Sequence, residues 1–370
     1  MKIYKRSEYV NIAQEASQWR LMVWKFRKHK IALISSFLLP LLYIGALLSK
    51  FLSPYLPDDR FPEYSGIPPQ TIHISDENGL CAPYVYGLST GYDQQSFKRI
   101  TIIDTDTRYP VNFFAHGKPY KVFGLFDSDF HLLTCEGPMF LFGTDQSGRD
   151  LFTRVLYGSR ISLSVGLVGI FITMILGISL GGISGYFGGR TDDIIQRVID
   201  FIVCVPTIPL WMVLAAAFPR SWPQYQIYIC IVAITSITGW TGLARVVRGK
   251  MLSVRQEGYV LAAQIAGASN SYVIRKHMIP SFASYIIVSL TMSIPGTILG
   301  ETSLSFLGLG LMPPVISWGV LLKDVQNLES IAMMPWLLIP ALFVITTMIL
   351  FNFLGDGLRD AMDPYKMDGA

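Results

Sequence analysis

The sequence predicts an all-α, polytopic membrane protein with a small β-rich insertion outside the membrane. Composition is the first observation behind this prediction, because the chain of 370 residues is 51% hydrophobic and only 15% charged. A soluble domain usually has about 25% charged residues. The second observation is that the apolar residues are gathered into blocks. Several blocks are long enough to cross the hydrocarbon core of a bilayer, which takes about 20 residues of helix.

Six uncharged stretches are long enough to be transmembrane helices. They cover residues 31–49, 161–187, 201–219, 221–244, 278–300 and 331–355. Some are longer than a bilayer requires, so tilted or broken helices are expected. The first stretch could be a signal peptide, but thirty residues precede it and no small-residue cleavage site follows before Lys50. We therefore interpret it as a retained span.

Lysine and arginine indicate the orientation, because cytoplasmic loops carry an excess of both. Eight basic residues lie within 1–30 and six within 245–277, against only Arg220 and Lys323 in the short segments on the other side. Both termini and the 245–277 loop are therefore predicted to be cytoplasmic. Aromatic and basic residues mix at 19–30, which fits an interfacial helix or a plain positively charged anchor equally well.

These patterns divide the chain into five regions. They are a cytoplasmic segment at 1–30, a first span at 31–50, an extracytoplasmic insertion at 51–150, a five-helix core at 151–356 with a cytoplasmic loop at about 245–280, and a cytoplasmic tail at 357–370.

The insertion at 51–150 is polar and rich in proline and glycine. Short β-like runs at 71–75, 99–104, 111–114 and 120–125 predict a small sheet. It could cover a transport entrance, dock a partner, or act only as a packing lid. Cys81 and Cys135 both lie in it, which leaves a disulfide open. At its end, Asp150 and Arg154 are four residues apart, so we expect them to pair on a short amphipathic helix before the second span.

Glycine and proline suggest how the spans pack. Gly177, Gly181 and Gly185 recur at a spacing of four, which allows two helices to approach closely. Prolines interrupt other spans at positions 206, 209, 295 and 340. Glu301 follows the fifth predicted span, where a hydrated or partner-paired boundary residue is favoured over a gating residue.

Several kinds of chemistry have no signature in the sequence. There is no GxxxxGK[ST] phosphate loop, no HExxH and no nucleophile elbow, and the five histidines are scattered. We therefore predict neither a catalytic site nor a metal site, and no residue can be assigned to substrate binding. The middles of the predicted spans lack ionisable residues, which argues against transport driven by a proton gradient, because proton relays require such groups. A net charge of only +4 gives no indication of nucleic-acid binding.

The predicted cytoplasmic loop contains the most informative segment. Ala262, Ala263 and Ala266 predict a short helix with little side-chain bulk, and Gly267 is suited to end it. A helix of this kind can enter a groove on another protein. The alternative is an ordinary alanine-rich interfacial helix.

This segment resembles the EAA loop of bacterial ABC importer permeases, which reads Glu-Ala-Ala, three residues, Gly, nine residues and Ile-x-Leu-Pro. Ala262, Ala263, Gly267 and Pro280 keep their places, while Leu261, His277 and Ile279 replace the Glu, Ile and Leu of the pattern. The resemblance implies a loop that couples the permease to an ATPase. Its residues here would be Tyr259, Leu261, Ala262, Ala263, Ala266, Gly267, Ala268 and Pro280.

Further motifs resemble the C-type permeases of oligopeptide and dipeptide importers. They lie at 143–150, 157–163, 185–189, 301–310, 317–319 and 354–364. The resemblance implies six transmembrane helices of the type I ABC importer permease fold, in the bacterial inner membrane. It also implies a second homologous permease, two cytoplasmic ATPases that bind ATP and magnesium, and an extracytoplasmic solute-binding protein. This chain itself would hold no cofactor.

The motifs identify the transport machinery but do not by themselves identify the transported solute. Peptides are favoured, and nickel chelates, opines or oligosaccharides are alternatives within the same machinery. A secondary transporter working alone and a non-transporting membrane scaffold belong to different classes. The spacing of the loop motif argues against both.

Overall fold

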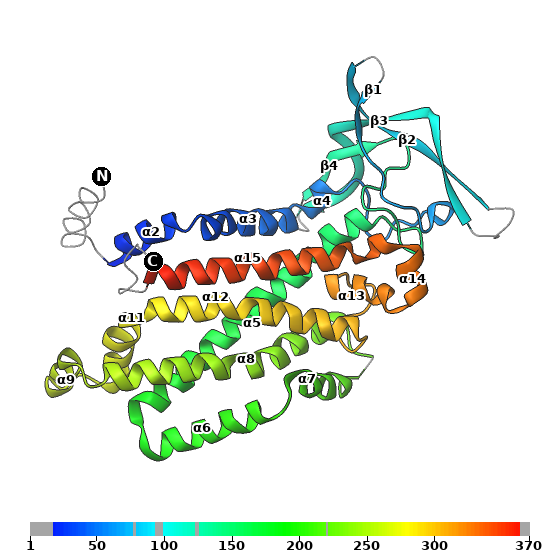
Figure 1. Ribbon diagram of the computed structural model, residues 1–370. Helices are drawn as coiled ribbons and strands as arrows, with labels where there is room; N and C mark the ends of the chain where they lie inside the picture. The colour runs from blue at the N-terminus through cyan, green and yellow to red at the C-terminus, as the bar shows by residue number, and fades with distance from the viewer. Residues whose placement is uncertain (1–17, 77–78, 93–98, 123–125, 220, 363–370) are drawn as a thin grey trace, which may run out of the picture. The chain divides into compact units, whose positions relative to one another are not determined.

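The computed structural model describes residues 18–76, 79–92, 99–122, 126–219 and 221–362 (Figure 1). The chain forms two compact units. Unit 1 contains Met1–Pro40, Val165–Gly300 and Thr346–Ala370, and unit 2 contains Leu41–Ser164 and Glu301–Ile345.

Helices dominate the described residues. They are α2 (Gln18–Lys28), α3 (Lys30–Leu47), α4 (Ser49–Leu52), α5 (Leu151–Phe187), α6 (Gly189–Cys204), α7 (Thr207–Ala216), α8 (Gln224–Val254), α9 (Gly258–Ile265), α10 (Asn270–Tyr272), α11 (Ile279–Ser281), α12 (Ala283–Phe306), α13 (Trp318–Leu322), α14 (Leu328–Met333) and α15 (Ile339–Met362). Shorter turns are the 3-10 helices η1 (Pro62–Tyr64), η3 (Lys323–Gln326) and η4 (Pro335–Leu338) and the π-helix η2 (Val273–Met278). The strands are β1 (His73–Asp76), β2 (Gly79–Tyr92), β3 (Arg99–Val122) and β4 (Phe126–Cys135).

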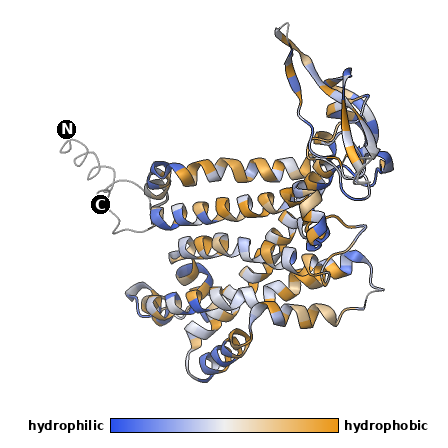
Figure 2. Ribbon diagram, turned by 45° about the vertical axis from the view of Figure 1, so that its right-hand side comes forward, coloured by the Kyte–Doolittle hydropathy of each residue, from blue (hydrophilic) through white to orange (hydrophobic). Residues whose placement is uncertain are grey.

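Five helical segments of the described chain are long and apolar enough to cross a membrane. They are α3, α5, α8, α12 and the segment Pro335–Met362, which joins η4 to α15. The long helices α3 and α15 are coloured mainly as hydrophobic along their lengths in Figure 2.

The third predicted span, at 201–219, is not a single straight helix. Helices α6 and α7 pass the same test only as a pair, bent by 86°. Val205 ends α6 in an extended conformation, with φ −87° and ψ 129°. Pro206 follows it, and a residue before proline is disfavoured in the helical region. The bend therefore has a local cause in the chain.

The other predicted boundaries differ because charge ends an apolar block without ending a helix. Helix α8 continues ten residues past 244, to Val254, and carries Arg245 and Arg248 within it. Helix α5 is continuous from Leu151, so the separate amphipathic helix expected before the second span is wrong. Helix α12 starts at Ala283 and runs past Gly300 to Phe306.

In unit 1, the glycines of α5 face α8 at very short range. An added Cβ would lie 2.7 Å from the Leu243 side chain at Gly177, 2.5 Å from the Ala244 carbonyl oxygen at Gly181, and 2.6 Å from the Met251 Cβ at Gly185. No real side chain fits at such distances. Close packing of small residues is a main source of helix association in lipid. This contact therefore fixes α5 against α8.

Two ion pairs also link α6 to α8. Arg248 donates to both carboxylate oxygens of Asp192, at 2.6 and 2.5 Å, in the two-bond geometry that makes Arg–carboxylate pairs strong. Arg245 pairs with Asp200 at 2.7 Å. The second pair is exposed and contributes little, so the Asp192–Arg248 pair adds more to the apolar contact of Ile199 with Trp240 and Ala244 between α6 and α8.

In unit 2, the strands form one antiparallel sheet of order β1-β2-β3-β4. The predicted runs at 99–104 and 111–114 lie on a single strand, β3, which has a positive φ of 53° at Phe114. The run at 120–125 reaches beyond the described residues. Cys81 on β2 and Cys135 on β4 are free cysteines on strands that β3 separates, so the structure has no disulfide between them.

The sheet is attached to the chain that follows the first span. Lys50 donates from Nζ to the Lys121 carbonyl oxygen at 2.8 Å. The ring nitrogens of buried His131 lie 2.8 Å from the carbonyl oxygens of Ser53 and Lys118. Helix α4 and its C-cap residue, Ser53, are thus joined to β3 and β4 by hydrogen bonds.

A turn that contains charged residues precedes α5 in unit 2. Asp145 accepts from the backbone N–H of Arg149 at 3.0 Å and from its Nε at 2.7 Å, and it also pairs with Arg154. The expected pair between Asp150 and Arg154 is therefore wrong. Asp150 instead accepts from the Thr153 N–H at 2.8 Å, which is the bond of a helix N-cap.

We predict that Gly181→Ala destabilises the protein and that its neighbour does not. The added methyl at Gly181 meets the Ala244 backbone, and overpacking of this kind costs about 1–3 kcal/mol. Gly182 has no atom within 4 Å of its Cβ position, so Gly182→Ala should be neutral or stabilising by up to about 1 kcal/mol. Thermal unfolding of the purified variants in detergent measures the difference. Equal melting temperatures would contradict the contact.

We also predict a pH-dependent effect of Asp150→Asn. Asp150 is 3% exposed, and burial raises its pKa to about 7. A carboxyl with a raised folded-state pKa destabilises the fold as pH rises from about 4 through 7, because the unfolded chain loses the proton first. Asparagine keeps an acceptor for the Thr153 N–H without that penalty. The variant should be more stable than wild type at pH 8, by on the order of 3 kcal/mol.

At pH 4 to 5 the stability difference should shrink towards zero. Denaturation in detergent at both pH values measures it. A difference that does not change with pH would show that the Asp150 carboxyl does not titrate in this range.

Candidate functional site

The segment between α8 and α12 contains the residues that the sequence singled out. Helix α9 lies beyond the end of α8 (Figure 1), and α10, η2 and α11 lead back into α12. Glu257 precedes α9 in an extended conformation, with φ −69° and ψ 140°. Its carbonyl accepts the Val260 N–H at 3.0 Å, which starts the helix.

Gly267 ends α9 in a conformation that favours glycine. Its φ is +78°, and its N–H donates to the Gln264 carbonyl at 3.0 Å, while the Ala268 N–H donates to the Ala263 carbonyl at 3.1 Å. This pair of bonds is the Schellman motif. A Cβ at 267 would meet nothing within 4 Å, so the requirement is conformational rather than steric.

A buried apolar cluster, here called the loop anchor, holds the segment to the long helices of unit 1. It contains Tyr186, Leu243, Val247, Met251, Val260, Val273, Met278, Phe282 and Ile286. The loop contributes Val260, Val273 and Met278, each with no exposed surface. Burying a side chain of this size stabilises by about 1.5–3 kcal/mol. The loop is therefore a packed element rather than a loose connection.

The outer face of α9 is apolar and exposed. Tyr259 and Leu261 are each 45% exposed, and Ile265 is 88% exposed. No residue of α9 is charged. A surface helix normally turns its polar side to water, and exposed apolar patches mark interaction sites. The geometry fits a short helix that inserts its apolar face into a groove on another protein.

The structure gathers most of the predicted loop residues around this helix. Those exposed on α9 or its C-terminal turn are Tyr259, Leu261, Ala262, Ala266 and Gly267, and those half-buried against the loop anchor are Ala263 and Ala268. Pro280 lies apart in the first turn of α11, where its missing N–H costs no helical hydrogen bond. Leu261, which stands where the EAA pattern has Glu, is part of the apolar face.

Three further residues of this site were not assigned a role from the sequence. The Tyr186 hydroxyl accepts from Gln264 Nε2 at 3.2 Å and donates to Asn270 Oδ1 at 2.8 Å. Tyr186 lies in the stretch 185–189 that the sequence marked only as a family motif. Spacing along the chain gives no signal for its contacts, because its partners are 78 and 84 residues away.

Unit 2 contains a separate polar cluster around Glu301, whose side chain is fully buried. Its carboxylate accepts from the hydroxyls of Ser317 at 2.7 Å, Ser305 at 2.8 Å and Ser162 at 3.2 Å. The Ser162 oxygen in turn accepts the Trp318 N–H at 3.0 Å. The hydrated or partner-paired boundary position expected for Glu301 is therefore wrong. The residue joins three segments of unit 2 from inside.

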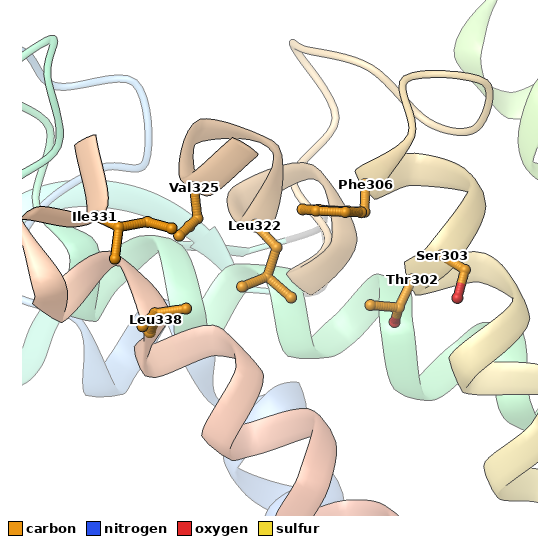
Figure 3. Close-up of a pocket in the computed structure, with 7 residues that line it drawn as sticks. All are labelled: Thr302, Ser303, Phe306, Leu322, Val325, Ile331 and Leu338. Atoms are coloured by element: carbon orange, nitrogen blue, oxygen red, sulfur yellow. The ribbon is translucent and has the colours of Figure 1, made fainter. Parts of the chain in front are cut away.

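A cavity of about 350 Å³ lies beside this cluster (Figure 3). It is lined by Thr302, Ser303, Phe306, Leu322, Val325, Ile331 and Leu338. The lining carries no charge and is mostly hydrocarbon, which favours an apolar group over a charged solute. Within the described ranges, no group of three or more His, Cys, Asp or Glu side chains is placed to hold a metal ion.

Comparison with known proteins gives two matching family models. Residues 177–366 match the model described as "Binding-protein-dependent transport system inner membrane component". Residues 17–69 match the "N-terminal TM domain of oligopeptide transport permease C". The first match covers α9 and the loop anchor.

One curated relative extends over almost the whole chain, and others match about 60% of it. The dipeptide transport system permease protein DppC of Lactococcus lactis is 31% identical over 360 residues, covering 95% of this chain and 92% of the relative. The oligopeptide transport system permease protein OppC of Bacillus subtilis is 41% identical over 224 residues, covering 60% of this chain and 71% of the relative.

Among solved structures, the MetNI methionine ABC transporter in an inward-facing conformation is similar with a TM-score of 0.45 and 15% identity. The similarity covers 56% of this chain and 96% of that chain. From the first family model and the Lactococcus relative together, the chain belongs to the family of binding-protein-dependent transport system inner membrane components.

Proposed function

We propose that this chain is the membrane-embedded permease subunit of an ATP-driven importer of oligopeptides or dipeptides. One observation carries the proposal: α9 is a short helix with an apolar exposed face and a glycine-terminated end, packed onto the membrane helices through the loop anchor. The names of the relatives, which are oligopeptide and dipeptide permeases, support the substrate class.

In the proposed topology, the bent pair α6–α7 acts as the third of six spans. The apolar length of the other five and the distribution of basic residues support this arrangement. Both termini and α9 would lie in the cytoplasm, and the sheet of unit 2 would lie outside. The proposed regions are 1–30, 31–50, 51–150, 151–356 and 357–370, as derived from the sequence.

The proposed partners are a second homologous permease, two cytoplasmic ATPases and an extracytoplasmic solute-binding protein. The ATPases would bind ATP and magnesium, and this chain would hold no cofactor and hydrolyse nothing. The family description, which names binding-protein-dependent transport, supports the last of these partners. The apolar face of α9 supports a protein partner on the cytoplasmic side.

In the proposed cycle, the loop anchor transmits movement from α9 to the long helices. ATP binding would draw the two ATPases together, and α9, seated in one of them, would move with it. Because Val260 and Met278 of the loop are fully buried in the same cluster as residues of α5, α8 and α12, that movement would pass to the long helices. ATP hydrolysis and product release would reset the complex. The solute would favour one state only through differential affinity for it.

Affinity purification of the tagged chain from gently solubilised membranes tests the proposal. We expect the second permease and ATP-binding subunits to co-purify, and a peptide-loaded binding protein to raise the ATPase activity. A chain that elutes alone, under conditions that preserve other membrane complexes, would contradict it. Stimulation by a nickel chelate, an opine or an oligosaccharide, but not by peptides, would contradict the substrate class alone.

We predict that Gly267→Asp reduces peptide uptake at least about tenfold without reducing membrane insertion. Aspartate tolerates the left-handed backbone better than most residues, so the loss should come from a charge placed beside the apolar face of α9. Gly249→Asp is the matched control, because that exposed glycine of α8 also has nothing within 4 Å of its Cβ position. It should transport normally. Normal uptake by Gly267→Asp at normal expression would refute the role of this turn.

A further inference from the structure

Tyr186 is the only residue of α5 in the loop anchor, and it is 6% exposed. Its ring packs among apolar side chains of the cluster and lies edge-on to Phe187, with ring centroids 5.2 Å apart. The ring alone would serve for packing. A buried tyrosine carries an additional hydroxyl that must find a hydrogen-bond partner.

The hydroxyl has two partners, and both belong to the loop. It donates to Asn270 Oδ1 at 2.8 Å and accepts from Gln264 Nε2 at 3.2 Å. A hydroxyl has one proton and two lone pairs, so both bonds form together. Gln264 lies in the last turn of α9 and Asn270 begins α10. The Tyr186 hydroxyl of α5 is therefore hydrogen-bonded to residues on both sides of the Gly267 turn.

The two hydrogen bonds of the Tyr186 hydroxyl are polar contacts at a cluster whose other members are apolar. The loop reaches the long helices through Val260, Val273 and Met278, whose contacts are non-directional and allow small sliding movements. Hydrogen bonds require a defined distance and angle. The Tyr186 hydroxyl therefore fixes the orientation of α9 in a way that the apolar contacts do not.

We propose that Tyr186 is a positioning residue. Its hydroxyl bridges Gln264 and Asn270, so that α5 moves together with α9. The inference rests on the proposed function, since it concerns how the docking helix transmits force. The positioning role belongs to the hydroxyl of Tyr186 and not to its aromatic ring. Loss of the hydroxyl should leave the fold and the docked ATPases in place and lower the number of peptides imported per ATP hydrolysed.

The test compares Tyr186→Phe with Tyr285→Phe in the complete complex, reconstituted with its co-purifying subunits and binding protein into proteoliposomes. Tyr285 lies on α12 and is 42% exposed, and its ring sits 3.6 Å from Lys250 Nζ, a contact that phenylalanine keeps. Both substitutions remove the same atom. Uptake of a radiolabelled tripeptide and ATP hydrolysis are measured on the same vesicles, together with the subunit ratio and the melting temperature.

We expect Tyr186→Phe to keep the subunit ratio and melting temperature of the wild type and to lower the ratio of peptide to ATP by about three- to tenfold, as expected for one or two lost hydrogen bonds. Tyr285→Phe should stay within about twofold of wild type. An unchanged ratio for Tyr186→Phe, or the same loss in both variants, overturns the inference. Loss of the ATPases from Tyr186→Phe overturns it too, because the hydroxyl would then serve assembly.

A second pair of variants separates the bridge from general disturbance of the loop. Asn270→Asp keeps the acceptor for the Tyr186 hydroxyl and should retain most of the coupling. Asn270→Ala removes the acceptor and should resemble Tyr186→Phe. Equal coupling in the two variants overturns the inference. If the wild-type complex shows no ATP-dependent uptake, the proposed function fails as well, which is distinct from a working wild type that tolerates Tyr186→Phe.

Discussion

The close approach of α5 to α8 is the contact on which the rest of unit 1 depends. With a side chain at Gly181 or Gly185, the backbone of α8 could not lie where it does. At the end of this seam, Gly185 faces Met251, and the next residue along α5, Tyr186, enters the loop anchor with Met251. The glycine spacing therefore decides where the loop can attach. A shift of either helix along the seam would separate the hydroxyl of Tyr186 from its partners.

The attachment explains how so short a helix could serve as the proposed docking element. An isolated helix of eight residues is unstable in water. Helix α9 is held by Val260 on its inner side, by its start at Glu257 and by the Schellman turn at Gly267. With its inner side fixed, the outer side can present Ile265 and Leu261 to a partner at little further entropic cost. The exposed Ala262 next to Leu261 adds little bulk, which leaves room for a groove wall to approach.

The sequence predicted the features that depend on local pattern. The blocks of apolar residues located the long helices, the spacing of the α5 glycines indicated close packing, and Gly267 marked the end of α9. The sequence did not predict contacts whose partner residues lie far away in the chain. Nothing near Glu301 indicated that three serine hydroxyls would surround its carboxylate. The spacing rule paired Arg154 with Asp150, but the N-cap geometry turns Asp150 away and leaves Arg154 to Asp145.

We propose that the outer face of α9 contacts an ATP-binding subunit. Photocrosslinking in the intact complex tests it most directly, with benzoylphenylalanine placed at Ile265, which is 88% exposed, or at Leu80 on β2, which is 90% exposed. We expect an adduct with the ATP-binding subunit from position 265 and none with that subunit from position 80. A complex that contains the ATPase but gives no adduct from position 265, or equal yields from both positions, would contradict it.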